Sequence, residues 1–192
     1  MSLAGKTIIM SGGSRGIGEA IAVRAARDGA NVALLAKSCI DHLAAADNAH
    51  VLTLSPPITL DPKWFSTATA YTIAKFGMSL VTLGLSEELR ELGIAANSLW
   101  PRTAIDTAAV RNVVGAGLSS HSRTPAIMAD AAYEILVRPS RECTGNFFID
   151  DDVLEEAGVT DFSIYLNGGE ESDLALDFWV EPKGPHDPSL SL

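Results

Sequence analysis

Two side chains that could exchange a proton with a substrate, Tyr71 and Lys75, lie four residues apart. The pattern around them predicts a long helix over residues 66–92, ended by Gly93. Residues four apart lie on one face of a helix, one turn from each other. A phenol has a pKa of about 10 in water, and a nearby ammonium favours the phenolate, so we expect Lys75 to lower the pKa of Tyr71. Such a pair could serve as a general acid and base on a hydroxyl or carbonyl group.

A glycine-rich turn near the N-terminus could hold phosphate groups. It follows a short apolar run, residues 6–11, and precedes a helix that we expect over residues 19–28. Glycines let the backbone approach a pyrophosphate, and the start of a helix points unpaired N–H groups and its positive dipole end at it. An ordinary glycine-rich turn is the alternative. The residues expected to bind a dinucleotide are Gly12, Gly13, Ser14, Arg15, Gly16, Ile17 and Gly18.

The end of the next expected strand, residues 31–36, bears on which dinucleotide would bind. An acid at this point holds the ribose 2′-OH of NAD, whereas a cation accommodates the 2′-phosphate of NADP. Here Lys37 follows the strand and Arg15 lies in the glycine turn, with no carboxylate between residues 31 and 38. We therefore expect NADP(H) rather than NAD(H), with a solvated surface role for Lys37 as the alternative.

Strand-like and helix-like segments alternate along the chain, which predicts an α/β fold with a parallel sheet. Further strands are expected over residues 51–54, 94–100 and 146–149, and a further helix over 125–137. Residues 150–192 hold half of the 24 acidic residues but only one of the 14 basic ones. We expect this tail to wrap the surface in an extended form or to be partly disordered, with its acids forming a solvated face.

The composition excludes several classes of protein. A net charge of −10 argues against sequence-independent nucleic-acid binding, which needs clustered lysine and arginine. No run of 18 consecutive apolar residues could cross a membrane. Neither the histidines nor Cys39 and Cys143 show the spacing of metal ligands. Without a disulfide framework, the chain is expected to be cytoplasmic.

In combination, these motifs resemble the short-chain dehydrogenase/reductase family. By itself, the Tyr71–Lys75 spacing usually marks a packed tyrosine and a solvated lysine. Together with GGSRGIG, the phrases SPP, YTIAK, LWPRTAI and TGNFFID are similar to the hydroxysteroid-dehydrogenase-like branch of that family, over about residues 3–160. The resemblance implies a Rossmann-like, doubly wound parallel sheet and a nicotinamide cofactor. It also implies that Tyr71 is the general acid/base, Lys75 its partner, and Ile105 a neighbour of the nicotinamide carboxamide.

One departure from the family is length. Its members place two further βα units before the serine-bearing strand, whereas 13 residues separate Lys37 from Val51 here. At about 30 residues per unit, about 60 are missing, so we expect a break near Ser38–Cys39. A Cα–Cα distance other than about 3.8 Å would reveal it. The expected organisation is a dinucleotide-binding domain over residues 1–160 and an acidic tail over 161–192.

A second departure concerns the catalytic serine. The family usually places it 13 residues before the tyrosine, which is Ile58 here. The nearest serine, Ser55, lies sixteen residues before Tyr71 and is followed by two prolines. Two interpretations stay open: a longer loop brings Ser55 to the site as a catalytic residue, or Ser55 merely ends the strand.

A third departure is Arg102, which stands where the family often has a glycine. This arginine would attract an acidic substrate or pair with the tail.

The sequence therefore predicts an oxidoreductase that transfers hydride between NADP(H) and a small-molecule carbonyl or secondary alcohol. The alternative is a non-catalytic sensor or scaffold that binds a dinucleotide. By resemblance, we also expect a homo-oligomer, a dimer or tetramer, paired through the long helix. No metal, nucleic acid or membrane partner is expected.

Overall fold

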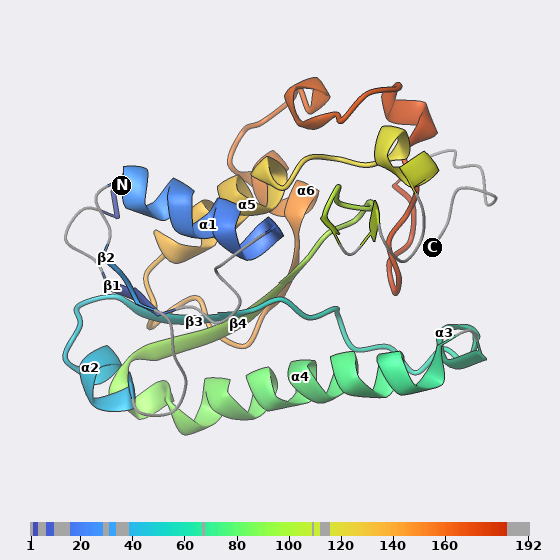
Figure 1. Cartoon of the computed structure of the whole chain (residues 1–192). Coiled ribbons are helices and arrows are strands. Elements are labelled where there is room, and N and C mark those ends of the chain that lie inside the picture. Colours follow the sequence, from blue (N-terminus) through green and yellow to red (C-terminus); the bar gives the residue numbers. More distant parts are fainter. Residues whose placement is uncertain are drawn as a thin grey trace.

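Parallel strands, hydrogen-bonded in one group of two and one group of three, form a central layer in the computed structural model. The structure describes residues 2–3, 7–9, 16–28, 31–33, 39–66, 68–108, 110–111 and 116–183. Strand β1 (Thr7–Ile9) pairs with β2 (Asn31–Ala33). Strand β4 (Ile94–Trp100) lies between β3 (Ala49–Thr53) and β5 (Phe147–Ile149). Every one of these pairings is parallel, and β1 lies beside β3 (Figure 1). The expected α/β class is confirmed.

Helices cover the two faces of this sheet (Figure 1). On one face lie α1 (Gly16–Arg27), α5 (Ala126–Leu136) and α6 (Asp150–Glu156). On the other lies α4 (Thr69–Glu88), with α2 (Ile40–Ala44) near its C-terminal end and α3 (Lys63–Ser66) before its N-terminal end. Short 3₁₀ turns complete the described elements, at residues 90–92, 116–121, 163–165 and 171–173.

The burial pattern explains why these segments take these positions. All seven residues of β4 are buried, as expected of a central parallel strand covered on both faces. The helix expected over 66–92 is interrupted at its start and tightens into a 3₁₀ turn before Gly93, whose φ of 71° suits glycine. A Cβ on Gly93 would also lie 2.6 Å from the Arg141 guanidinium.

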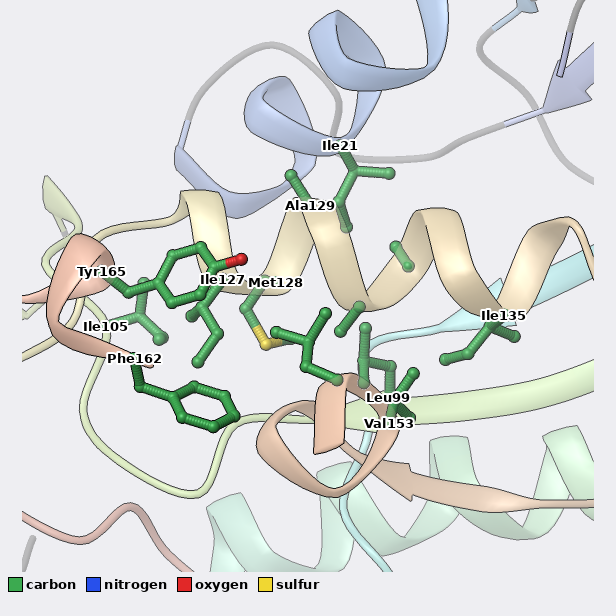
Figure 2. Packing of buried hydrophobic residues seen from close by; sticks show 13 residues of the cluster. Ile21, Leu99, Ile105, Ile127, Met128, Ala129, Ile135, Val153, Phe162 and Tyr165 are labelled. Atoms are coloured by element: carbon green, nitrogen blue, oxygen red, sulfur yellow. The ribbon is translucent and has the colours of Figure 1, made fainter. Parts of the chain in front are cut away.

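The main core joins the sheet to the α1–α5–α6 layer. Ile127 and Met128 of α5 point toward Leu99 of β4 and Val153 of α6 (Figure 2). Ile21 of α1 closes this cluster from above. These contacts fix α1 against the sheet and so set where its N-terminus lies.

A second core holds much of the C-terminal segment. Leu176, Trp179 and Val180 are buried together with Phe76 of α4 and Trp100 of β4. The expectation that the tail only forms a solvated face is therefore wrong for residues 174–180. Its apolar residues fill the space between β4 and α4. The boundary between residues 160 and 161 stays a prediction, as does the break near Ser38–Cys39, because Ser38 lies outside the described residues.

Candidate active site

The residues expected to do chemistry gather where the parallel strands end. The carboxyl ends of β3 and β4 meet at one edge of the sheet, and both α1 and α4 begin toward that edge (Figure 1). In open α/β sheets, ligands bind in the crevice outside the carboxyl ends of the strands. The loops after β3 and β4 and residues 174–180 meet at the same edge.

Lys75 joins α4 to the loop after β3. Its Nζ donates a hydrogen bond to the carbonyl oxygen of Leu54, at 3.1 Å, and lies 4.8 Å from the centre of the Trp100 ring. The Tyr71 ring centre is 6.0 Å from the same ammonium. Burial lowers the pKa of Lys75, and the negative charge of Asp177 raises it. The structure thus brings Lys75 between Tyr71 and the Ser55 loop.

Tyr71 lies under aromatic side chains of the C-terminal segment. Its ring packs edge-on against Phe178, at 6.1 Å between centres, and in a tilted arrangement against Trp179, at 5.4 Å. Burial raises the pKa of Tyr71, and the charge of Asp177 raises it further. The expectation that Lys75 lowers this pKa is wrong here, because burial disfavours the phenolate. The phenol therefore holds its proton at neutral pH.

Ser55 is placed beside the carbonyl group that Lys75 binds. It is fully buried, and its Oγ has no hydrogen-bond partner among the residues that the structure describes. The loop that carries it is fixed to α4, because Ser79 Oγ donates to the Pro56 carbonyl oxygen at 2.6 Å. A buried hydroxyl without a partner is a donor left for another group. A catalytic role for Ser55 stays a prediction.

Only part of the expected dinucleotide site is described. Gly16 opens α1 with a φ of 61°, and Ile17 and Gly18 follow in its first turn. A cavity of about 770 Å³ lies beside this turn and is also lined by Thr107. Ile105 is buried in the main core near Ile127 and Tyr165 (Figure 2), and its place at the nicotinamide stays a prediction. Outside the described residues lie Gly12, Gly13, Ser14, Arg15 and Lys37.

The cavity beside α1 does not reach the proton-exchanging pair. Neither Tyr71 nor Lys75 lines it, and neither lines a second cavity of about 240 Å³ near Arg123. The two halves of the expected site therefore lie at one edge of the sheet without sharing either described cavity. Phe178 and Trp179 pack against Tyr71, which stays 45% exposed.

Two carboxyl groups that sequence reasoning missed lie at the same edge. Asp150 follows β5, is fully buried, and accepts hydrogen bonds from the backbone N–H groups of Arg102 and Asp151 at 2.9 and 2.8 Å. Burial raises its pKa to about 7, and the charge of Asp151 raises it too. Burial likewise raises the pKa of Asp177 to about 7. The signal that could have found Asp177 is the aromatic pair after it, which is unusual in an acidic tail.

Arg102 pairs with the C-terminal part of the chain, as one of its two interpretations predicted. Its guanidinium forms ion pairs with Asp151 and Asp152, each at 2.7 Å, and donates to the Glu181 carbonyl oxygen at 2.8 Å. These bonds anchor residues near 181 to the end of β4. Because its donors are engaged in this way, Arg102 is a structural cation.

Two expected absences concern metals and membranes. Among the described residues, no cluster of three or more histidine, cysteine or acidic side chains could hold a metal ion. No described helix has the length and apolar character to cross a bilayer.

Comparison with known proteins places these features in context. No protein-family model matches the chain. Hydroxysteroid dehydrogenase-like protein 2 of Rattus norvegicus is 53% identical over 132 residues, which are 69% of this chain but 25% of the rat protein. The chain thus spans about a quarter of the length of this relative.

Two solved structures match over nearly their whole length. A short chain dehydrogenase from Mycobacterium thermoresistibile is 36% identical, with a TM-score of 0.84 over 98% of this chain and 99% of its own. A Xanthomonas campestris protein described provisionally as a dehydrogenase is 33% identical, with a TM-score of 0.87 over 95% of this chain and 100% of its own.

Structures below 25% identity share the fold alone. The angucycline C-6 ketoreductase LanV with bound NADP is 18% identical, with a TM-score of 0.52 over 78% of this chain and 95% of its own. A 7α-hydroxysteroid dehydrogenase complexed with NADH is 16% identical, with a TM-score of 0.55 over 77% of this chain and 93% of its own. These matches confirm that the sheet is of the Rossmann-like type.

Proposed function

The chain belongs to the short-chain dehydrogenase/reductase family, and from that membership we propose that it is an NADP(H)-dependent oxidoreductase acting on a carbonyl or secondary alcohol. The observation that carries the proposal is the placement of Lys75. Its ammonium binds the Leu54 carbonyl group, next to the Ser55 hydroxyl, which has no hydrogen-bond partner among the described residues, and 6.0 Å from the Tyr71 ring centre. Family membership alone does not fix an activity, whereas these three groups form a unit able to move a proton.

When bound, a nicotinamide dinucleotide would supply a hydride for the carbonyl carbon. Tyr71 donates its phenolic proton to the carbonyl oxygen, which becomes the hydroxyl group of the product. The raised pKa of Tyr71 suits this direction, because the phenol is protonated at neutral pH. The ammonium of Lys75 stabilises the phenolate that remains, and the Ser55 hydroxyl donates to the same substrate oxygen.

The dinucleotide is assigned to the turn that opens α1. The first N–H groups of a helix have no partner within it, and here they begin at Gly16, whose positive φ a glycine adopts without strain. Gly12, Gly13, Ser14 and Arg15 would complete the phosphate contacts. We favour NADP(H) because Arg15 and Lys37 supply cations for a 2′-phosphate. Distant members of the fold bind NADP or NADH.

The test is NADPH consumption with a panel of ketones, aldehydes and quinones. Tyr71→Phe should lower kcat by about 10²–10⁴-fold, because it removes the proton donor, while NADPH binding followed by fluorescence persists. Tyr133→Phe, on α5, is the matched control and should keep the activity. NADH in place of NADPH should bind more weakly. Equal turnover in Tyr71→Phe would overturn the proton-donor role.

A second candidate function is a dinucleotide-binding sensor or scaffold without catalysis. The packing of Phe178 and Trp179 against Tyr71 favours it, because these rings contact the phenol ring that a substrate would have to reach. The same assay separates the two functions. Tight NADPH binding without Tyr71-dependent turnover on any carbonyl would select the sensor.

We also propose that two copies of the chain associate through α4. Its outer face exposes Ile73, Leu80 and Val81, whose exposed fractions are 61%, 57% and 61%. Gly77 and Gly84 lie on the same stripe, and a Cβ on either would meet only open space. Small residues between apolar ones let a second helix approach closely.

A further inference from the structure

Three polar side chains of α4 follow one another at intervals of four residues: Tyr71, Lys75 and Ser79. This spacing places them on one face of the helix, at successive turns. Tyr71 is exposed, Lys75 is half-buried and Ser79 is fully buried. The Ser55 loop, residues 54–62, runs along the helix on its way from β3 to α3 (Figure 1). The three side chains therefore lead from the exposed phenol into the interior beside this loop.

Two of these side chains bind carbonyl groups on the two sides of Ser55. Lys75 Nζ donates to the Leu54 carbonyl oxygen at 3.1 Å. One turn further along the helix, Ser79 Oγ donates to the Pro56 carbonyl oxygen at 2.6 Å. Adjacent turns of α4 thus hold the backbone immediately before and immediately after Ser55.

The Ser79 hydroxyl serves the loop rather than its own helix. Its Oγ also lies 3.3 Å from the Lys75 carbonyl oxygen, which is the bond within the helix that a serine often makes. A hydroxyl has only one proton to donate, and the Pro56 oxygen is the closer acceptor. Proline has no backbone N–H, so this carbonyl group is the only backbone group through which Pro56 can be held. Without Ser79, a buried carbonyl group would lose this donor, which is unfavourable.

The side chain between the two bound carbonyl groups is the Ser55 hydroxyl. It is fully buried, and it has no hydrogen-bond partner among the residues that the structure describes. Most buried hydroxyl groups in proteins have a partner, so one without needs a reason. Because the backbone is held on both sides, the direction of the Ser55 side chain is held as well.

We propose that Ser79 is a positioning residue for the proposed reaction: through the Pro56 carbonyl group it fixes Ser55, so that the Ser55 hydroxyl meets the substrate oxygen that Tyr71 protonates. Ser79 touches neither substrate nor cofactor and acts through Ser55. The inference rests on the proposed function for its catalytic meaning, whereas the hold of Ser79 on the loop is measurable without turnover. One face of α4 then carries the proton donor, its ammonium partner and the group that fixes Ser55.

The direct test measures amide hydrogen exchange in the whole chain by mass spectrometry, in peptides that span the Ser55 loop. The Ser55 N–H donates to the Thr53 carbonyl oxygen at 3.1 Å, and this bond must open before the amide exchanges. Ser79→Ala should speed this exchange about three- to tenfold, as the loss of one hydrogen bond predicts. Alanine is a better helix former than serine, so α4 itself should persist.

Ser86→Ala is the matched control. Ser86 is a buried serine of the same helix, but its Oγ donates to the Leu83 carbonyl oxygen of α4 itself, at 2.7 Å. An unchanged exchange rate in Ser79→Ala, or an equal change in Ser86→Ala, overturns the proposal. Should Ser79→Ala fail to fold by circular dichroism, Ser79→Cys fills a similar space with a weak donor and must also speed exchange. Exchange at the wild-type rate in Ser79→Cys would then overturn the proposal.

The catalytic consequence separates this proposal from the proposed function. With an active wild type, Ser79→Ala should lower kcat about three- to tenfold at unchanged NADPH affinity, and Ser86→Ala should change neither. In a Ser55→Ala background, Ser79→Ala should lower kcat no further, because Ser79 acts through Ser55. An equal loss in both backgrounds would mark a merely structural residue and contradict the positioning role. A wild type that shows the exchange effect but turns over no carbonyl would reject the proposed function and retain the hold of Ser79 on the loop.

Discussion

At the scale of single residues, the carboxyl edge of the sheet combines acidic groups whose pKa is raised by burial. Tyr71 keeps its proton because burial disfavours the phenolate. Asp150 has no exposed surface, and its Oδ2 has no partner within the described structure. A protonated carboxyl group fits this environment better than a carboxylate, since an unpaired buried charge is costly.

This reasoning predicts how Asp150 affects stability as pH changes. Its pKa is raised from 3.8 to about 7 on folding, so the folded chain binds this proton more tightly than the unfolded chain. The resulting stabilisation is complete below 3.8 and is lost as pH rises through about 7. Asp150→Asn cannot ionise and should avoid this loss, which is on the order of 2–3 kcal/mol between pH 5 and pH 8.

Urea unfolding at several pH values checks this outcome. The free energy of unfolding of Asp150→Asn minus that of wild type should be larger at pH 8 than at pH 5, because only wild type loses stability over this range. In the control variant Glu88→Gln, a change at an exposed residue, the free energy of unfolding should change with pH as it does in wild type. If the free energy of unfolding changed with pH identically in Asp150→Asn and wild type, Asp150 would be ionised in the folded chain over this range.

Residue roles at the site differ in how far the sequence predicts them. That Tyr71 and Lys75 share a face of α4 is predictable from their spacing, because a helix fixes which residues lie together. The direction in which the pKa of Tyr71 shifts cannot be predicted from spacing. It depends on contact with Phe178 and Trp179, which lie more than a hundred residues away in sequence. Asp177 is hidden for the same reason, since composition places it in an acidic tail.

At the scale of elements, the segment 174–180 is the least expected part of the fold. It has no regular periodicity, and Trp179 adopts a left-handed φ of 64°, which is uncommon for a bulky residue. By contrast, β4 is expected over residues 94–100 and found there, because a run buried on both faces is almost wholly apolar. Segments with a repeating pattern are predictable, and one held by tertiary packing is not.

Packing is what maintains this strained conformation, which leads to a prediction for Trp179. Its side chain is 4% exposed and meets Tyr71, Phe76 and Trp100 within 5.7 Å between ring centres. Trp179→Ala should lower the free energy of unfolding by about 3–5 kcal/mol, as large-to-small changes in aromatic cores do. Denaturant unfolding followed by circular dichroism measures this.

Ile164→Ala serves as the control for the same C-terminal part of the chain, since Ile164 is 70% exposed. It should change the unfolding free energy by less than about 0.5 kcal/mol. If Trp179→Ala changed the free energy of unfolding as little as Ile164→Ala, the second core would not be what holds residues 174–180 in place.

At the scale of the whole molecule, the two faces of α4 differ in what they meet. The inner face is fixed to the sheet by residues such as Thr72, Phe76 and Ser79, all buried. The outer face exposes Ile73, Leu80 and Val81 to solvent beside two glycines, Gly77 and Gly84. A contiguous apolar stripe of this kind marks an interaction surface more often than a free one.

The proposed association through α4 predicts the effect of placing charge on this stripe. Leu80→Glu combined with Val81→Glu should convert an assembled chain into monomers, because two apposed helices would bury four carboxylates without partners. Light scattering coupled to size exclusion measures the mass directly. Leu60→Glu, at a position 84% exposed and off the helix, is the control and should leave the mass unchanged. A wild type that is monomeric at micromolar concentration, or a double variant of unchanged mass, would remove α4 as the interface.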